Sequence, residues 1–141
     1  MLLLLMMMQA LDPLDVTGVW VPPNGKAHVE IALDETGSPR GEIIWYPKLV
    51  TEEGDGSGPL KVKDDPDELL GAVLVDSFEA GQQRWRRGLI YDPRAGKSYR
   101  SAIHRASEDT LAVQGCLSII CRTQKWHRLA EEDIIRVEMD D

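Results

Sequence analysis

The sequence is poor in several of the residues that mark specialised classes of protein. Among its 141 residues are two cysteines, one phenylalanine and 6% aromatic residues. Sixteen Lys and Arg stand against 24 Asp and Glu, so the net charge of −8 argues against general nucleic-acid binding, which needs a basic surface. The long apolar run at the start is too short for a membrane-spanning helix, which needs about 20 such residues. The remaining composition, 43% hydrophobic and 28% charged, is typical of one globular domain and excludes disorder and collagen-like repeats.

The apolar run covers residues 1–10, MLLLLMMMQA, and has the length of the apolar centre of a secretory signal. No Lys or Arg precedes it, and the small-x-small cleavage rule is met only at Ala10. Residues 1–11 are therefore interpreted as a signal-peptide remnant, with a frayed apolar N-terminus or a start inside a longer leader as alternatives. The first interpretation predicts a periplasmic or secreted domain over residues 12–129, followed by an acidic tail over residues 130–141.

Turn residues divide the chain after Val16 into short segments rich in strand-forming residues. The predicted strands cover residues 19–21, 28–33, 40–46, 71–77, 84–91, 98–105, 110–115 and 119–128. Helix signals are weak, and only residues 64–70 could cap one short turn. Many short strands without alternating helices predict an all-β, antiparallel sandwich or barrel. Consecutive hairpins favour an eight-stranded up-and-down barrel, because closure removes exposed edges.

Hairpin registers can be tested by asking whether the apolar faces coincide. Pairing Glu30 with Glu42 places Val29, Ile31 and Leu33 on one face with Gly41, Ile43 and Trp45. Pairing Tyr91 with Lys97 places Leu89 opposite Tyr99 and Trp85 opposite Ile103. Continuing the same face places Ile103 opposite Leu111 and Ser101 opposite Val113. The three hairpins thus agree on one buried face. Glu30 and Glu42 would share the other face with His28 and Arg40, which indicates a solvated, charge-balanced surface rather than a paired-carboxylate site.

Cys116 and Cys121 are separated by four residues near the end of the chain. In an oxidising compartment they could form a disulfide across a tight turn. The alternatives are two small buried residues in a strand, or a metal site completed by His104 or His127. Metal motifs normally contain two close pairs of ligands, and this sequence has one pair and isolated histidines, so we predict no metal site.

Several short blocks resemble known proteins. Gly18-Val19-Trp20 is similar to the Gly-x-Trp signature of lipocalins, and the blocks at residues 88–93, 96–99, 115–116 and 121–128 resemble the bacterial family of domain of unknown function 2147 (DUF2147). The resemblance covers roughly residues 12–129 and implies a lipocalin-like barrel, export in many members, and no established activity. It also implies structural roles for Gly18, Trp20, Trp126 and Arg128, with Trp20 lying against Arg128 at the base of the barrel. His127 and the glycine-free turn at residues 117–120 depart from the family pattern.

An eight-stranded barrel has an interior that side chains fill or that holds one small ligand. The candidate ligand-binding residues are those of the predicted inner face: Trp45, Trp85, Arg87, Leu89, Tyr91, Tyr99, Ser101 and Ile103. If Arg87 points inward it needs an anion, because an unpaired buried charge costs several kcal/mol, which suggests an amphipathic ligand with its acid group there. A bulge at Gly88 would instead turn Arg87 outward.

The sequence therefore predicts an extracytoplasmic binder of a small hydrophobic or amphipathic ligand, without cofactor or catalysis, since no nucleophile–base arrangement is visible. The alternative is an envelope protein–protein interaction module with a filled barrel and a basic outer face, formed by Arg84, Arg86, Arg100 and His104. Charge is unevenly distributed. Residues 51–69 and 131–141 each sum to −5, whereas residues 84–105 sum to +6, so the acidity does not oppose an anionic ligand.

Overall fold

The computed structural model describes residues 10–47 and 69–136, and this part of the chain is built of antiparallel strands. The strands are β1 (Gly18–Val21), β2 (His28–Leu33), β3 (Pro39–Trp45), β4 (Val73–Asp76), β5 (Glu79–Ala80), β6 (Trp85–Asp92), β7 (Lys97–Ser107), β8 (Thr110–Leu117) and β9 (Ile120–Arg128). All eight predicted strands are present, and β5 is a short addition. A 3-10 turn, η2 (Glu131–Asp133), follows the last strand. Most of the predicted helical turn, residues 64–68, lies outside the described residues.

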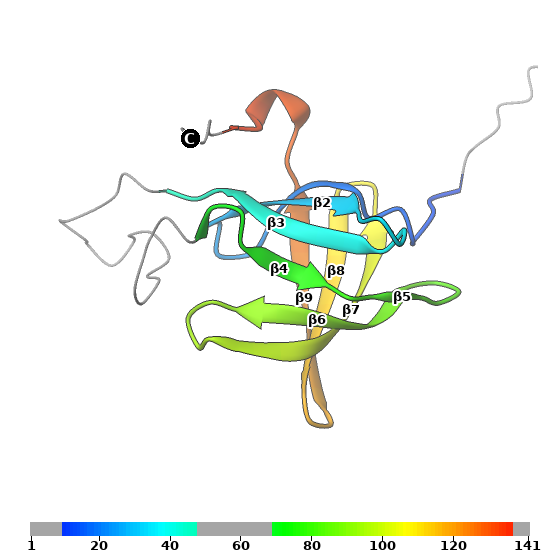
Figure 1. The fold of residues 1–141 in the computed structure, drawn as a ribbon. Helices are drawn as coiled ribbons and strands as arrows, with labels where there is room; N and C mark the ends of the chain where they lie inside the picture. The colour runs from blue at the N-terminus through cyan, green and yellow to red at the C-terminus, as the bar shows by residue number, and fades with distance from the viewer. Residues whose placement is uncertain (1–9, 48–68, 137–141) are drawn as a thin grey trace, which may run out of the picture.

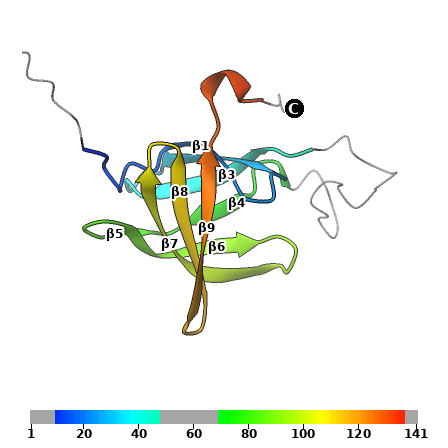
Figure 2. The same cartoon turned by 180° about the vertical axis from the view of Figure 1, so that it is seen from behind.

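The sheet closes into an eight-stranded barrel (Figures 1 and 2). Neighbouring strands follow the order β4-β3-β2-β1-β9-β8-β7-β6-β5, and the additional pairing of β4 with β6 closes the eight strands from β4 to β6 into a ring, with β5 as an extra strand beside β6. The predicted up-and-down barrel is therefore confirmed. The β1–β9 contact is brief, with Trp20 opposite Arg128 and Val21 opposite His127. The remainder of β9 has β8 as its strand neighbour within the described ranges.

Turn chemistry explains the first hairpin. The Asp34 carboxylate accepts hydrogen bonds from the backbone N–H groups of Thr36 and Ser38, and Gly37 adopts a φ of 82°. This Asx-type turn sets the register, because the Asp34 side chain accepts hydrogen bonds from backbone N–H groups that have no strand partner in the turn. Glu30 pairs with Glu42 and Val29 pairs with Ile43, as predicted.

The outer face of this hairpin is charge-balanced. Arg40 forms an ion pair with Glu42, and Arg136 binds Glu30 through both guanidinium nitrogens, at 3.0 and 2.7 Å. The hydrogen bond from Arg136, aided by its charge and opposed by burial, lowers the pKa of Glu30. Through this contact the segment after β9 lies back against β2.

Two predicted registers are wrong, and the first error arises from a bulge. Leu89 pairs with Arg100 and Tyr91 with Ser98, although Trp85 does pair with Ile103 as predicted. An extra residue between Trp85 and Gly88 shifts the strand by one position and reverses the alternation of its side chains. Ile103 pairs with Val113 rather than Leu111, which is a shift of two residues that leaves the inner face unchanged; this ladder also contains an irregularity near Arg105.

The barrel interior is filled by side chains. Its largest fully buried members include Trp20, Ile31, Ile43, Ile103 and Leu111, and Val29, Val75 and Val113 complete the layer. These residues come from β1, β2, β3, β4, β7 and β8, so the hydrophobic core lies along the central axis of the barrel. The packed layer determines which part of the inner face a ligand can reach.

Candidate functional site

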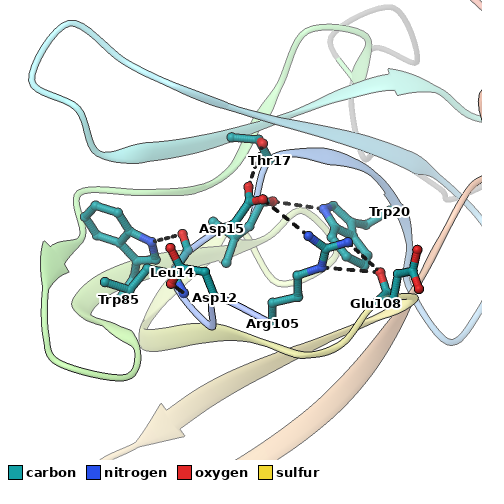
Figure 3. Close-up of polar contacts among 9 residues, drawn as sticks. Asp12, Leu14, Asp15, Thr17, Trp20, Trp85, Arg105 and Glu108 are labelled. Atoms are coloured by element: carbon teal, nitrogen blue, oxygen red, sulfur yellow. Dashed lines mark hydrogen bonds and ion pairs between the residues drawn. The ribbon is translucent and has the colours of Figure 1, made fainter. Parts of the chain in front are cut away.

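One end of the barrel is closed by the segment before β1 (Figure 3). The indole N–H of Trp20 donates to the carbonyl oxygen of Val16 at 3.0 Å, and that of Trp85 donates to the carbonyl oxygen of Leu14 at 2.8 Å. Two tryptophans from distant strands thus hold residues 12–17 across this end. We call it the closed end. Trp85 was predicted to line a ligand site, and the structure places it in this closure instead.

A largely buried arginine completes the closure. The Arg105 side chain is 10% exposed, and its guanidinium reaches a carboxylate oxygen of Asp15 at 3.3 Å. It also donates twice to the carbonyl oxygen of Glu108, at 2.8 and 3.3 Å. The need of a buried arginine for a partner, assigned to Arg87 from the sequence, is met here at Arg105. Strand alternation could not reveal this, because the partner lies 90 residues away in the chain.

Trp20 and Arg128 are cross-strand partners beside Gly18. A Cβ atom at Gly18 would lie 3.6 Å from Nε1 of Trp20 and 3.9 Å from Nε of Arg128, and the φ of Gly18 is 139°. The position therefore favours glycine for its backbone conformation, since a Cβ atom would make only ordinary van der Waals contacts with the two side chains. Trp126, on the adjoining strand, is buried in the core.

Ser101 and Ile103 lie on the inner face, as predicted, but inside the packed core. Ile103 is fully buried, and the Ser101 hydroxyl donates to the carbonyl oxygen of Gln114 at 2.7 Å. Neither side chain is accessible to a ligand in this conformation.

Arg87, Leu89 and Tyr91 lie on the outer surface. The bulge places Arg87 at a φ of 57°, and its side chain, 71% exposed, approaches Glu79 at 3.6 Å. Leu89 and Tyr91 are exposed. For Arg87 this is the alternative expected from a bulge at Gly88. The expectation that Leu89 and Tyr91 face the interior is wrong, because the extra residue in β6 directs Gly88 and Ile90 inward in their place.

The opposite end, which we call the open end, has an apolar inner face. Ile90 pairs with Tyr99, and a Cβ atom on Gly115 would lie 3.6 Å from Ile90, so Ile90 faces Gly115. Alternation along β8 and β9 continues this face to Leu117, Ile120 and Arg122. We call Ile90, Tyr99, Leu117, Ile120 and Arg122 the open-end surface. Its members are half-buried or exposed, which contrasts with the packed core below them.

Trp45 lies at the end of β3 and is half-buried. Its ring contacts the ring of His28 with the centroids 4.4 Å apart and the planes 33° from parallel. Nδ1 of His28 is buried and has no hydrogen-bond partner in the described part of the chain. Burial lowers the pKa of His28, because it penalises the charged imidazolium.

Two surface hollows lie away from the predicted ligand-binding residues. One, of about 640 Å³, lies between the β7–β8 turn and the segment after β9, and brings Glu108, Asp109 and Glu131 near His127. The other, of about 440 Å³, is lined by Arg84, His104 and Arg105 with Pro13. Over residues 10–47 and 69–136, no cluster of three or more metal-ligating side chains occurs. Within the same ranges, no helix has the length and apolarity to span a membrane.

The structure joins the two cysteines in a disulfide, one of the three arrangements that the sequence left open. Cys116 and Cys121 are cross-strand partners at the tip of the β8–β9 hairpin, with their Cα atoms 4.0 Å apart. The turn between the strands contains Ser118 at a φ of 57°, so it forms with a serine where a glycine is more usual.

An antiparallel eight-stranded barrel that starts with Gly-x-Trp, is closed at one end and has Trp20 opposite Arg128 is a lipocalin-like protein. Residues 18–128 match the family model described as an uncharacterised protein conserved in bacteria (DUF2147), and the chain belongs to this family. Among solved structures it is similar to a Helicobacter pylori protein, HP1028, described as belonging to the lipocalin family. The match has 18% identity and a TM-score of 0.62, and covers 89% of this chain and 94% of that one. No curated protein matches the chain.

Proposed function

We propose that this chain is an extracytoplasmic binding protein that takes an amphipathic, anionic small molecule at the open end of its barrel. The observation that supports the proposal is a contrast along the inner face. The deeper layer is packed with fully buried side chains such as Ile103 and Val113, whereas Tyr99, Leu117 and Ile120 stay accessible and apolar beside the exposed Arg122.

The chemistry of these residues matches the two parts of such a ligand. An apolar chain gains free energy when it covers accessible apolar surface, by roughly 25 cal/mol per Å². An arginine binds a carboxylate or phosphate through paired hydrogen bonds. Arg122 has no acidic partner in the described residues, so its hydrogen-bonding groups are available to an anion. Arg122 thus replaces Arg87 as the residue proposed to bind the acid group of the ligand.

Two features support a location outside the cytoplasm. The Cys116–Cys121 disulfide is of the kind that persists in oxidising compartments. Residues 1–10 have the composition of the apolar centre of a secretory signal.

The test is a titration with a fluorescent anthroyloxy derivative of a long-chain fatty acid, followed by displacement with oleate. Saturable binding is expected, with Arg122→Gln weakening it roughly three- to tenfold because one charge-assisted contact is lost. Arg87→Gln is the matched control, since Arg87 is an exposed arginine on the outer face, and it should bind as the parent does. In the same way Tyr99→Ser should weaken binding and Tyr91→Ser should not. Absence of saturable binding, or equal effects of Arg122→Gln and Arg87→Gln, would contradict the proposal.

A second candidate, an interaction module for an acidic protein partner, is supported by the outer face of β6. Arg84, directly before β6, and Arg86, on β6, are exposed, and Arg84 and His104 both line the smaller of the two surface hollows. Native mass spectrometry of the purified protein separates the candidates. A small co-purifying molecule that Arg122→Gln releases favours the ligand-binding function, and a protein complex that Arg84→Gln dissociates favours the module.

A further inference from the structure

The tip of the β8–β9 hairpin carries a cluster of exposed aliphatic side chains. Leu117, Ile119 and Ile120 are 68%, 93% and 65% exposed, within four consecutive residues. Single exposed aliphatic residues are ordinary on soluble proteins, whereas a contiguous exposed group marks a contact surface. We call residues 117–120 the hairpin tip.

The hairpin tip is held away from the barrel. Figures 1 and 2 both show the β8–β9 turn projecting beyond the body of the barrel, past the neighbouring strands. The Cys116–Cys121 disulfide joins the two strands directly behind the tip, and Nη2 of Arg100 donates to the carbonyl oxygen of Ser118 at 2.7 Å. These contacts restrain the tip in its exposed position, so little conformational entropy is lost when it binds.

The charge of the hairpin is opposite to that of the chain. Residues 110–130 contain no Asp or Glu and include Arg122, Lys125 and Arg128, although the whole chain has a net charge of −8. Arg100 adds a further cation at the base of the tip. The apolar tip and its basic flank therefore fit an anionic partner.

The spacing fits a lipid surface. An extended strand rises about 3.3 Å per residue, so Arg122 lies about 7 Å behind Ile120, the first residue of β9. Peripheral segments bury apolar side chains about 5–10 Å into the headgroup region, where cations behind them meet the phosphates. We propose that the hairpin tip is a membrane-surface anchor that seats Leu117, Ile119 and Ile120 among the acyl-chain ends of an anionic bilayer, with Arg100 and Arg122 at the phosphates. This contact goes beyond the proposed ligand binding: it shares Leu117, Ile120 and Arg122 with the open-end surface, and Ile119 and Arg100 belong to it alone.

The experiment measures tip insertion directly in the full chain. Ile119→Trp places an indole at the tip, and Leu33→Trp is the matched control, since Leu33 is an exposed aliphatic residue at the end of β2, in a different hairpin. Each variant is mixed with vesicles of phosphatidylcholine, or of equimolar phosphatidylcholine and phosphatidylglycerol, that contain brominated acyl chains. Extra quenching is expected for Ile119→Trp with the anionic vesicles and not for Leu33→Trp. Because bromine quenches only nearby indoles, contact of any other segment with the vesicles does not imitate this result.

A second measurement is the affinity for the same anionic vesicles, by sedimentation. Ile119→Ser should lower the affinity for these vesicles roughly five- to tenfold, and Leu33→Ser should leave that affinity unchanged. Equal quenching of the two tryptophan variants, or unchanged affinity of Ile119→Ser, would overturn the proposal and leave a protein partner as the occupant of the tip. Ile119 is outside the open-end surface, so Ile119→Ser should bind the fluorescent fatty acid as the parent does. Loss of vesicle binding and loss of fatty-acid binding are therefore separate outcomes.

Discussion

The ring of Phe78 occupies the space that Gly88 leaves by having no side chain. A Cβ atom on Gly88 would lie 2.1 Å from Cδ1 of Phe78 and 2.3 Å from Cε1. Phe78 is the single phenylalanine of the chain and is 5% exposed. Gly88 follows Arg87 at the bulge in β6, so the same local feature brings the ring into the core and turns Arg87 to the outside.

Gly88→Ala should lower the free energy of unfolding by about 3 kcal/mol, because the new methyl group forces a packed ring to move. Urea unfolding measures this loss. Replacing the ring with the smaller leucine side chain should relieve the clash. The double variant Phe78→Leu/Gly88→Ala should therefore lose less free energy of unfolding than the sum of the losses of the two single variants. Additive losses would show that the ring and the glycine do not contact each other.

Ser38→Ala should cost about 2 kcal/mol of stability. The buried Ser38 hydroxyl donates to the carbonyl oxygen of Phe78 at 2.9 Å and accepts from its N–H at 3.2 Å. Removal of the hydroxyl leaves two buried backbone groups without a partner. Thermal or urea unfolding checks the loss, and Ser98→Ala, at an exposed position, should change stability little. Equal effects of the two variants would argue against the buried pair of hydrogen bonds.

The fold could be predicted from the sequence because hairpins are local. The turn after Leu33 and the alternation of β2 and β3 were sufficient to pair Glu30 with Glu42. The β6–β7 register was missed because a bulge adds one residue without changing which residues are apolar. The bulge itself was predicted at Gly88 as an alternative, since an isolated glycine inside a strand favours a bulge or a close approach.

The site was less accessible to prediction than the fold. Alternation places a residue on the inner face of a strand, but the depth of packing determines whether a ligand can reach it. Ser101 and Ile103 were correctly placed on that face and are covered by the core. The indole of Trp85 donates a hydrogen bond to the carbonyl oxygen of Leu14. The two residues are 71 positions apart, so a local sequence pattern cannot predict this contact. Arg122 was not predicted as a site residue, because the face of β9 on which it lies depends on the register of the β8–β9 hairpin.

Arg105→Met should loosen the closed end. The replacement keeps much of the side-chain volume but removes the hydrogen bonds to the Glu108 carbonyl and the ion pair with Asp15, at a cost of about 2 kcal/mol. Hydrogen exchange should rise in residues 12–17 in particular. Asp15→Asn should have a smaller effect, because Asp15 is half exposed and its ion pair is screened by solvent. If exchange in this segment is unchanged in Arg105→Met, Arg105 does not hold the closure.

Stability should decrease as the pH falls through the titration of His28. Burial lowers the pKa of His28 below its ordinary value of 6.5. The unfolded chain therefore binds this proton more readily than the folded chain does, so the free energy of unfolding falls with the pH from about 6.5 until the folded pKa is reached. His28→Gln should remove this part of the pH dependence. An NMR titration of the His28 ring should give a midpoint below 6.5, and a midpoint at or above that value would contradict the assignment.

Loss of the Cys116–Cys121 disulfide should destabilise the protein while leaving the barrel folded. The bridged residues have a sequence separation of 5, and the chain-entropy model for so short a loop gives about 2 kcal/mol. The barrel should persist, because its closure depends on the β1–β9 and β4–β6 pairings, which involve neither cysteine. The double variant Cys116→Ser/Cys121→Ser should therefore keep the far-ultraviolet circular dichroism spectrum of the parent and unfold at a lower urea concentration. Reductant should shift the parent to the midpoint of the variant and leave the variant unchanged. If reductant has no effect on the parent, the two cysteines are not joined in the folded protein.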